Sequence, residues 1–594
     1  VQRLLCHDTR IYVRLFLLII FYVCSAAQVQ AVVRYVKPGS AGSAPYTSWA
    51  TASNDLQAVI NASVAGDDIW VAAGTYIPNR RADALTIITV GDRDNAFVLK
   101  NGVRIFGGFN GTETATNQRN FATNISILSG DLGTAGSYTD NCYHVVVSAG
   151  TVSGTALNGF HIRYGNANGT GTITVNAISL GRGSGAGMRI NSSSPTISNC
   201  VFSANITTNN GGGMVCDNAS PPLTNCLFAG NTAVDAGALY NVNASAPQIV
   251  NCSFSGNNAT TTGGAIRNSA DSDPEISNCI IWGNLAAGFS NSIFNSDIAS
   301  VPLVNYSIIE GGYTGTKNQN SDPLFTNPVA ATLAPSISGD YRLQLCSPGI
   351  NGGLNSYVPG SINNDLDYNP RIHYGKVDCG VYEKQLALAV PNGSGIVFVD
   401  STRNGNGSSW ANAVKELADA LIAAKYNSGI TQIWVANGTY YPKYDADDDA
   451  SLVCSNSNRN NAFVTVPNVP IYGGFSGNET LLSQRDPFTN TVKLSGNIGA
   501  PGSSADNAYH VLINAGNVNS TLDGINIVEG NANGILFVTP NISVNGYTVS
   551  PRRGGGLFNI ASVLTIFQCT VESNYAGLTG GGIYDSLSGY ISNL

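Results

Sequence analysis

Four segments between residues 195 and 284 repeat one another without gaps, and this repeat limits the possible folds more than any other feature of the chain. They read PTISNCVFSAN (195–205), PPLTNCLFAGN (221–231), PQIVNCSFSGN (247–257) and PEISNCIIWGN (274–284). Their cysteines are spaced 26, 26 and 27 residues apart, at Cys200, Cys226, Cys252 and Cys279. A fixed period of this size is typical of a solenoid, because each unit can bury its apolar face only against its neighbours.

The repeat unit has the composition of short strands and turns. No window of the unit shows an apolar period of 3.6 residues, which excludes helical repeats. We expect Ile197, Cys200 and Phe202 to point inward, and Asn199 to turn the chain, because Asn tolerates the left-handed backbone conformation. Units stacked at about 4.8 Å align equivalent residues in ladders. The sequence therefore predicts an all-β fold, a right-handed parallel β-helix.

Composition and charge restrict the possible partners. Gly accounts for 67 of 594 residues and charged residues for only 11%, as a chain of strands and turns requires. The net charge is -8, and the basic residues form no cluster larger than pairs such as Arg80-Arg81 and Arg552-Arg553. Nucleic-acid binding is therefore disfavoured.

The first 27 residues have the features of a secretory signal peptide. Three arginines precede the apolar run 15–24, and Ser25-Ala26-Ala27 supplies small residues for cleavage. The run is too short to span a bilayer in the mature protein, so we expect no transmembrane segment there. Cys24 raises the alternative of a lipoprotein, but Phe21-Tyr22-Val23 lacks the small residues of a lipid-attachment site. The chain begins with Val, so we expect its true start to be missing.

The mature chain divides into consecutive segments. We expect residues 33–345 to form the first β-helix, with an N-terminal cap that includes a helix around Leu56, Val59 and Ile60, because a solenoid needs its open end covered. Residues 346–384 are predicted to form a closing module on this β-helix. The small apolar segment 385–396 is predicted to be a linker.

The motifs of the first β-helix then return in the same order in residues 397–594. Trp410 matches Trp49 at an offset of 361 residues, and Cys569 matches Cys200 at an offset of 369. We therefore predict two tandem β-helices. The second copy stops where the first reaches its second repeat, so we expect it to be incomplete.

Several short motifs, in this order twice over, carry a resemblance to known proteins. They are GTY (74–76), GGFNGTET (107–114), LSGD (128–131), YHVV (143–146) and GNA (165–167). In this order the chain resembles secreted right-handed β-helix proteins of Bacteroidetes-type bacteria, and its closing module is similar to the choice-of-anchor domain. The repeats also resemble those of chlamydial polymorphic outer-membrane proteins, with Phe-x-x-Asn from Phe202 to Asn205 and Gly-Gly-Ala-Ile from Gly263 to Ile266. The resemblance implies a secreted or surface-exposed protein, often adhesive, whose mode of attachment is open.

The cysteines are expected to be mostly buried thiols. Stacked cysteines on neighbouring strands have Cβ atoms about 4.8 Å apart, which is longer than a disulfide prefers. Cys200, Cys226, Cys252 and Cys279 should therefore be free. A bond between Cys346 and Cys379, both in the closing module, is the alternative left open.

Two acidic stretches are candidates for calcium, which takes several convergent oxygen ligands. One contains Asp365, Asp367 and Asn369, and the other is the run Asp445, Asp447, Asp448 and Asp449. The run lacks the glycine and terminal glutamate of a helix-loop-helix calcium site. Solvated acidic loops are the simpler interpretation of both, and we assign no metal ligand or cofactor.

Catalysis is the main alternative to a structural role, because many β-helices cleave acidic polysaccharides. Such enzymes need paired carboxylates near one bond, or calcium-binding acids with an arginine base. His144 and His510 lie at matching positions inside apolar strands, and His161 has no counterpart in the second copy, so we expect no base among them. The carboxylates of the repeats are scattered, at Asp217, Asp235, Asp271, Asp273 and Glu275. We assign no catalytic residue and expect a non-catalytic surface protein that binds a host, matrix or glycan partner; the alternative is a polysaccharide lyase or glycoside hydrolase.

Overall fold

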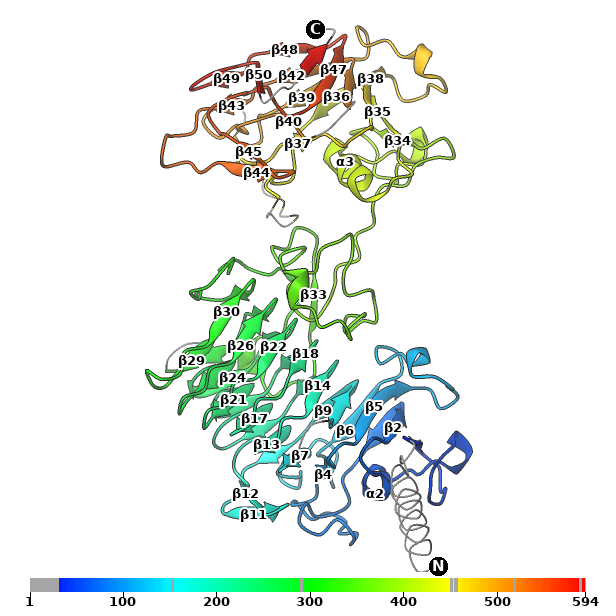
Figure 1. Cartoon of the computed structure of the whole chain (residues 1–594), viewed down its shortest axis with the longest axis vertical. Coiled ribbons are helices and arrows are strands. Elements are labelled where there is room, and N and C mark those ends of the chain that lie inside the picture. Colours follow the sequence, from blue (N-terminus) through cyan, green and yellow to red (C-terminus); the bar gives the residue numbers. More distant parts are fainter. Residues whose placement is uncertain are drawn as a thin grey trace, which may run out of the picture.

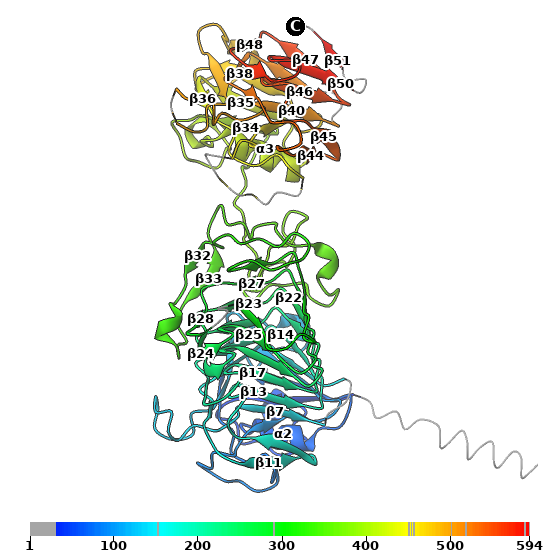
Figure 2. The same cartoon turned by 90° about the vertical axis from the view of Figure 1, so that its left-hand side faces the viewer.

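The computed structural model consists of two stacks of parallel strands along one long axis (Figure 1). It describes residues 31–150, 154–288, 292–448, 452, 454, 458–500, 502–516, 520–586 and 590–592. The predicted signal peptide and Asp449 lie outside these residues. We call residues 33–309 the first solenoid, 346–384 the closing module and 396–592 the second solenoid. Figure 2 shows the closing module between the two solenoids.

Three long parallel sheets and one shorter one, which starts only at β10 (Asn166–Ala167), form the walls of the first solenoid. In the repeats, each coil adds one strand to each sheet. The first sheet contains β1 (Val33–Val36), β2 (Asp68–Ala72), β5 (Arg104–Phe109), β8 (Ala156–Asn158), β14 (Thr196–Ser198), β18 (Leu223–Thr224), β22 (Gln248–Val250), β26 (Glu275–Ser277) and β30 (Leu303–Asn305). The second contains β3 (Gly74–Tyr76), β6 (Ser126–Ser129), β9 (Phe160–Arg163), β15 (Val201–Ser203), β19 (Leu227–Ala229), β23 (Ser253–Ser255), β27 (Ile280–Ile281) and β31 (Ile308–Ile309). The third contains β4 (Phe97–Val98), β7 (Val146–Ala149), β13 (Met188–Asn191), β17 (Met214–Asp217), β21 (Leu239–Val242), β25 (Ile266–Asn268) and β29 (Ile293–Asn295). The fourth contains β10 (Asn166–Ala167), β16 (Ile206–Thr207), β20 (Thr232–Asp235), β24 (Asn258–Thr262) and β28 (Leu285–Ala286). The chain therefore forms a parallel β-helix, as the repeat predicts.

The second solenoid is built in the same manner from fewer strands. Its first sheet contains β34 (Ile396–Val399), β35 (Gln432–Ala436), β38 (Ile471–Phe475), β41 (Ser520–Asp523), β47 (Val563–Phe567) and β51 (Tyr590–Ser592). The other two walls contain β36 (Gly438–Tyr440), β39 (Val492–Ser495), β42 (Ile525–Val528) and β48 (Thr570–Glu572), and β37 (Phe463–Val464), β40 (Leu512–Ala515), β46 (Leu557–Ile560) and β50 (Ile583–Ser586). A short pair contains β43 (Asn531–Ala532) and β49 (Tyr575–Ala576).

Antiparallel pairs and helices lie outside these walls. The pairs are β11 (Thr172–Val175) with β12 (Ile178–Gly181), β32 (Phe325–Asn327) with β33 (Asp340–Leu343), and β44 (Ile542–Val544) with β45 (Tyr547–Val549). The α-helices are α2 (Leu56–Ala62) and α3 (Leu417–Tyr426). The short 3-10 turns are η1 (Trp49–Thr51), η2 (Thr116–Gln118), η3 (Ala331–Leu333), η4 (Asn355–Tyr357), η5 (Trp410–Asn412) and η6 (Leu482–Gln484).

The interior of the repeats contains the predicted ladders. Ile197, Cys200 and Phe202 are completely buried, and Asn199 has a φ of 53°, in the left-handed region. The Phe202 ring stacks on that of Phe228 at a centroid distance of 4.7 Å, and the next pair in the ladder is spaced at 4.8 Å. The four repeat cysteines are free and buried. Identical residues therefore stack on each other because the register advances by one whole repeat per coil.

A second ladder of asparagines closes the turn after the phenylalanines. The Asn231 amide donates to the side-chain oxygen of Asn257 at 2.9 Å and to the carbonyl of Phe202 at 2.9 Å. Its own oxygen accepts from the Asn205 amide at 3.0 Å. All of these side chains are buried, so each coil satisfies polar groups of the coils next to it.

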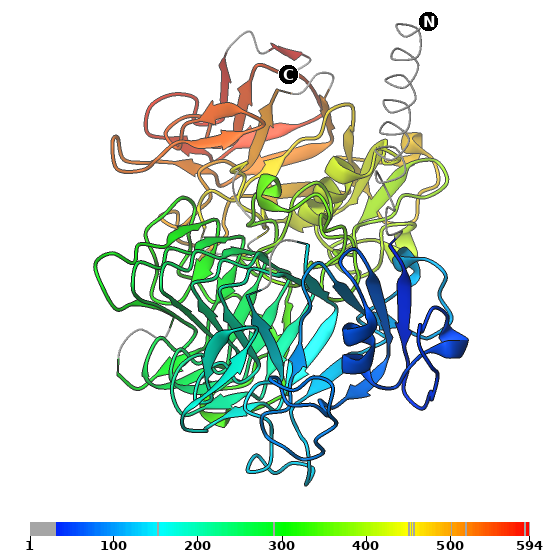
Figure 3. The ribbon, with the colours of Figure 1, turned by 60° about the horizontal axis from the view of Figure 1, so that its bottom comes forward.

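Each solenoid begins with a helix and an anchored tryptophan. In the first, Leu56, Val59 and Ile60 of α2 enter the core, and the helix lies at the near end of the stack in Figure 3. The indole of Trp49 donates to the carbonyl of Glu113 at 2.9 Å, and that of Trp410 donates to Glu479 at 2.9 Å.

The closing module lies along a flank of the first solenoid. Val381, Cys379 and Leu366 form one apolar cluster with side chains of the second sheet, and the Asn251 amide donates to the Asp378 carbonyl at 3.0 Å. The module follows the outer face of the coils, whereas α2 covers the beginning of the stack. The segment 385–396 also packs, because the small side chain of Ala389 is buried in the core of the second solenoid.

The structure corrects the cysteine alternative in the closing module. Cys346 forms a disulfide with Cys454 of the second solenoid, 108 residues away. Cys379 is a free, buried thiol whose sulfur faces the carbonyl of Tyr306 at 3.2 Å. Cys379 packs inward against the first solenoid, and the partner of Cys346 comes from a loop that only the tertiary fold brings near. The disulfide therefore links the closing module to the second solenoid.

Candidate functional site

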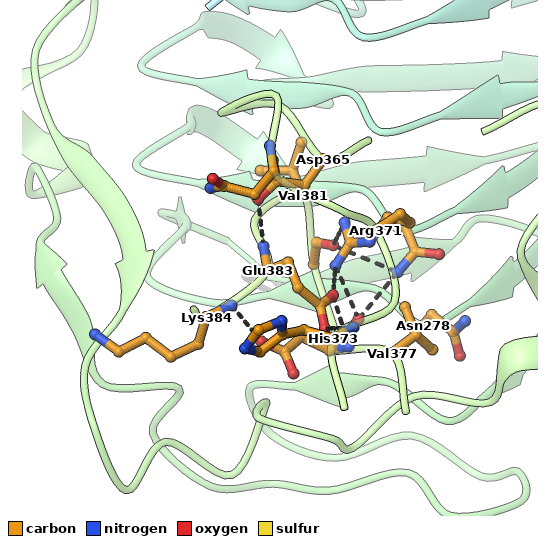
Figure 4. Close-up of polar contacts among 12 residues, drawn as sticks. Asn278, Asp365, Arg371, His373, Val377, Val381, Glu383 and Lys384 are labelled. Carbon is orange, nitrogen blue, oxygen red and sulfur yellow. Dashed lines mark hydrogen bonds and ion pairs between the residues drawn. The ribbon is translucent and has the colours of Figure 1, made fainter. Parts of the chain in front are cut away.

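The largest concentration of buried charge lies in the closing module (Figure 4). Arg371 and Glu383 form an ion pair at 2.6 Å, and their side chains are 1% and 0% exposed. Asp365 and Asp378 are buried beside them. Strongly buried ionisable groups of this kind are candidates for a functional site, although structural networks share the same signature.

The contacts of these carboxylates are with the backbone of the module. Asp365 accepts the amides of Asn369 and Glu383, both at 2.7 Å. Asp378 accepts the amides of Asn351 at 2.7 Å and Lys384 at 2.6 Å. The module has few strands to satisfy its backbone, so the carboxylates satisfy it instead. The cluster is sealed from solvent, and we interpret it as a folding device rather than a substrate site.

Burial shifts the acidity of the cluster. It raises the pKa of Asp365 to about 6 and that of Asp378 to about 7, although backbone amides oppose the shift in both cases. Burial, and then the charge of Asp378, also raises the pKa of Glu383, while Arg371 opposes this. The folded module therefore holds protons that the unfolded chain would release near pH 4.

This shift predicts a pH dependence of stability. Because the folded pKa values are raised, their stabilising contribution is fully present below about pH 4 and is lost as the pH rises through 6 to 7. We expect the module's free energy of unfolding to be about 4 kcal/mol lower at pH 8 than at pH 5. Hydrogen exchange of the module's amides at both pH values measures this. The Asp378→Asn variant should show a flatter profile, and an equal slope in variant and parent would contradict the assignment.

The first predicted acidic stretch does not converge on one point. Asp365 points inward, whereas Asp367 is bound by Arg342, whose Nη2 lies 2.8 Å from Oδ1. Asn369 contacts Asp365 through its backbone. Among the described residues, no group of three or more His, Cys, Asp or Glu side chains has the arrangement of a metal site.

A pocket of about 440 Å³ lies at the junction of the closing module and the second solenoid. The closing module contributes Asn351 and the turn 374–376 to its walls. The second solenoid contributes one side of α3, the loop before Cys454, strand β37 with the turn that follows it, and the β44–β45 turn. Its size is in the range of ligand-binding pockets, which occur preferentially at domain junctions.

The pocket is lined partly by aromatic rings and by two lysines. The rings of Tyr374 and Tyr426 lie 5.2 Å apart between centroids and join the module to α3. Tyr444 and Phe463 are also in the lining, and the Tyr444 hydroxyl donates to Asp419 at 2.6 Å. Lys376 and Lys425 supply positive charge, with the Lys425 ammonium 6.0 Å from the Tyr426 ring centroid.

The second predicted acidic stretch forms one edge of the same pocket. Asp445 accepts the amide of Asp447 at 2.9 Å and the side chain of Asn458 at 2.7 Å. Asp448 accepts the backbone amides of Asn545 and Gly546, both at 2.7 Å, and so closes the β44–β45 turn. These oxygens are already bound by protein donors, so the stretch is part of the pocket wall.

The scattered carboxylates of the repeats remain scattered in the fold, with two exceptions on the outer face of the third and fourth sheets. Arg189 pairs with Asp217 of the next coil at 2.8 Å, and Arg267 pairs with Asp235 at 2.6 Å. By contrast, Glu275 accepts the Gln248 amide at 3.2 Å, and Asp273 accepts the amide of Val301. Asp271 is exposed in a turn, with a φ of 61°.

The histidines occupy positions unsuited to a general base. Burial lowers the pKa values of His144 and His510 to about 4 each, and each ring nitrogen Nδ1 lies about 3 Å from a backbone carbonyl, that of Gly185 or Gly554. Burial also lowers the pKa of His161 to about 4. None of the three lines the junction pocket.

Comparison with known proteins adds little beyond the fold. The chain matches no family model. No curated protein sequence is similar to it. Among solved structures it is similar to a pectate lyase, with 14% identity, a TM-score of 0.28, and 59% of this chain and 96% of that chain covered. It is also similar to an alginate lyase of family PL6, with 13% identity, a TM-score of 0.15, and coverage of 95% and 88%. Similarities this low give no information about activity.

Sequence reasoning missed the junction pocket. Its residues lie between Asn351 and Asn545 and share no motif. Cys346 and Cys454 lie in the two parts of the chain that meet there, but nothing in the sequence pairs them.

Proposed function

We propose that this is a secreted or cell-surface β-helix protein that binds a glycan without cleaving it, with the junction pocket as the binding site. The observation that carries the proposal is the lining of three tyrosine rings together with lysine, aspartate and asparagine side chains. Aromatic faces pack against the C–H faces of sugar rings, and the polar groups exchange hydrogen bonds with hydroxyls. Secretion is supported by the signal-peptide pattern of residues 1–27. Among the described residues, no helix is long and apolar enough to cross a membrane.

The pocket favours binding over cleavage because its acidic groups are already engaged. Asp445 and Asp448 accept hydrogen bonds from protein donors, and no histidine is among the described residues that line the pocket. A cleaving enzyme needs a group free to take or give a proton at the bond that breaks.

The experiment is a binding screen of the chain from Ala31 onward against neutral and acidic polysaccharides, followed by titration calorimetry on the best ligand. The Tyr426→Ser variant is expected to weaken binding about tenfold, since it removes one stacking face. Tyr441→Ser is the matched control, because Tyr441 is 46% exposed and does not line the pocket. Equal affinity of parent and Tyr426→Ser would contradict the proposal.

The disulfide offers a second test of the same site. The pocket draws residues from both sides of the Cys346–Cys454 bond. The double variant Cys346→Ser/Cys454→Ser is therefore expected to bind the same ligand more weakly while both solenoids keep their circular dichroism.

The second candidate function is a polysaccharide lyase, favoured by the Arg189–Asp217 pair on the outer face of adjacent coils. Both partners are engaged, since Asp217 also accepts from Asn191 at 3.0 Å and Asn243 at 2.7 Å. Release of unsaturated sugar ends in the same screen, abolished by Asp217→Asn, would favour this function over binding.

A further inference from the structure

The loop between β43 and β44 presents four consecutive apolar side chains to solvent. Ile535, Leu536, Phe537 and Val538 are 63%, 53%, 97% and 71% exposed. This loop projects from the second solenoid in Figure 1, in orange beside β43. Monomeric soluble proteins rarely leave such continuous apolar surface in water unless it contacts something.

The loop is an ordered turn. The amides of Val538 and Thr539 donate to the Ile535 carbonyl at 3.1 and 2.8 Å, and the Ile535 amide donates to the Thr539 hydroxyl oxygen at 2.9 Å. Phe537 has a φ of 62°, an unfavourable conformation for a bulky side chain. The fold therefore holds the Phe537 ring at the tip at an energetic cost, which is more common at functional positions than elsewhere.

The corresponding hairpin of the first solenoid lacks this feature. Both hairpins follow the sequence GNANG, but the first continues with Thr170-Gly171 where the second has the apolar turn. The first hairpin ends at Arg182, which is neutralised by Asp94 at 2.7 Å. The second ends at Arg552 and Arg553, and no ion pair involves either of them within the described residues. The first solenoid thus forms the same hairpin without the apolar turn. Arg553 Nη1 donates to the Tyr584 hydroxyl at 2.9 Å and its guanidinium lies over that ring, which leaves Arg552 as the cation available to an anionic ligand.

The apolar turn and the two arginines line the same groove. Leu536, Phe537 and Val538 line a groove together with Arg552 and Arg553. The amide of Gly534, at the base of the loop, donates to the carbonyl of Pro551 at 2.9 Å, which places the arginines directly behind the apolar tip. A lipid bilayer presents the complementary order, with anionic phosphates outside and acyl chains within.

We infer that the 535–538 turn is a docking element for an anionic lipid surface: its apolar side chains enter the acyl region and Arg552 contacts the phosphates, while Arg553, held by Tyr584, adds positive charge beside it. The rest of the chain carries net negative charge, so attraction to such a surface has to be local. The inference is independent of the glycan pocket, which contains none of these residues.

The test is co-sedimentation of the chain from Ala31 onward with vesicles of phosphatidylcholine alone and of phosphatidylcholine with one quarter phosphatidylglycerol. This start removes the apolar segment 15–24, which could itself bind lipid, and keeps every residue of the described fold. The parent is expected to bind the anionic vesicles, and more weakly as salt rises. Phe537→Ser is expected to weaken binding about tenfold, since one buried Phe side chain supplies that much.

Three further variants separate the contributions. Arg552→Ser is expected to weaken binding severalfold to the anionic vesicles only. Phe488→Ser is the matched control, because Phe488 is 84% exposed but lies in another loop and does not line the groove. In a Phe537→Trp variant, added tryptophan fluorescence that is quenched by brominated acyl chains would support insertion of the tip.

Three results would overturn the inference. The parent could fail to sediment with anionic vesicles at millimolar lipid. The Phe488→Ser variant could lose as much binding as Phe537→Ser. Sedimentation could instead show a dimer that depends on Phe537 without vesicle binding, in which case a second copy of the chain occupies the groove.

Discussion

Replacing Arg371 with methionine is expected to destabilise the closing module by about 3–5 kcal/mol, because removing one partner of a buried ion pair leaves the other charge uncompensated. Arg371 pairs with Glu383 at 2.6 Å and also donates to the carbonyl of Gly380 at 3.1 Å. The loss should be smaller at pH 5 than at pH 8, because protonation of the nearby carboxyls removes the unpaired charge. Hydrogen exchange of the module's amides measures both effects.

Two comparisons make this result specific. The double variant Arg371→Met/Glu383→Gln should recover part of the loss, since it removes the charge that Arg371 left behind. Arg342→Met is the exposed counterpart, in the segment just before the module. Arg342 pairs with Asp367, but its side chain is 53% exposed. We expect it to cost less than about 1 kcal/mol. A similar cost for both arginines would show that the buried pair has no special role.

Replacing Asn231 with leucine is expected to destabilise the first solenoid by about 3 kcal/mol or more. Leucine has nearly the same volume, so the change leaves little cavity, but it removes the donor to the Phe202 carbonyl and the acceptor for the Asn205 amide. Each buried polar group left without a partner costs about 1–3 kcal/mol. Exchange rates of the β15 and β19 amides report the local free energy of opening.

Gln248→Ala is the control for the ladder. Gln248 is exposed on β22 of the next coil, and its side-chain amide donates to Glu275 at 3.2 Å. We expect a change within about 0.5 kcal/mol. If Asn231→Leu is no more destabilising than this control, the asparagine ladder does not hold the coils together.

The repeated interior followed directly from the sequence. The positions of Ile197, Cys200 and Phe202 recur once in every repeat. In a solenoid, apolar side chains at recurring positions can be buried only by pointing into its interior. The turn at Asn199 was predictable for the same local reason, because few residues other than Gly adopt its backbone conformation. Local geometry and a fixed period were sufficient here, since each coil contacts only its neighbours.

The buried charge cluster and the exposed apolar turn could not be predicted from a sequence period. The carboxylates at Asp365 and Asp367 alternate like metal ligands, yet one is buried by backbone amides and the other is held by Arg342. The apolar run around Phe537 can be seen in the sequence, but only the structure shows that its side chains are exposed and are not part of the core.

The sequence by itself determined the solenoid, the direction in which its repeat residues face and the free state of the ladder thiols. Only the tertiary structure decided that Cys346 pairs with Cys454, that the closing module lies along a flank of the first solenoid, and that a tyrosine-lined pocket forms where it meets α3. The physical reason is the range of the contacts. Ladder contacts join residues one repeat apart, so the period encodes them, whereas contacts between the module and the second solenoid join unrelated segments whose meeting depends on how the whole chain packs.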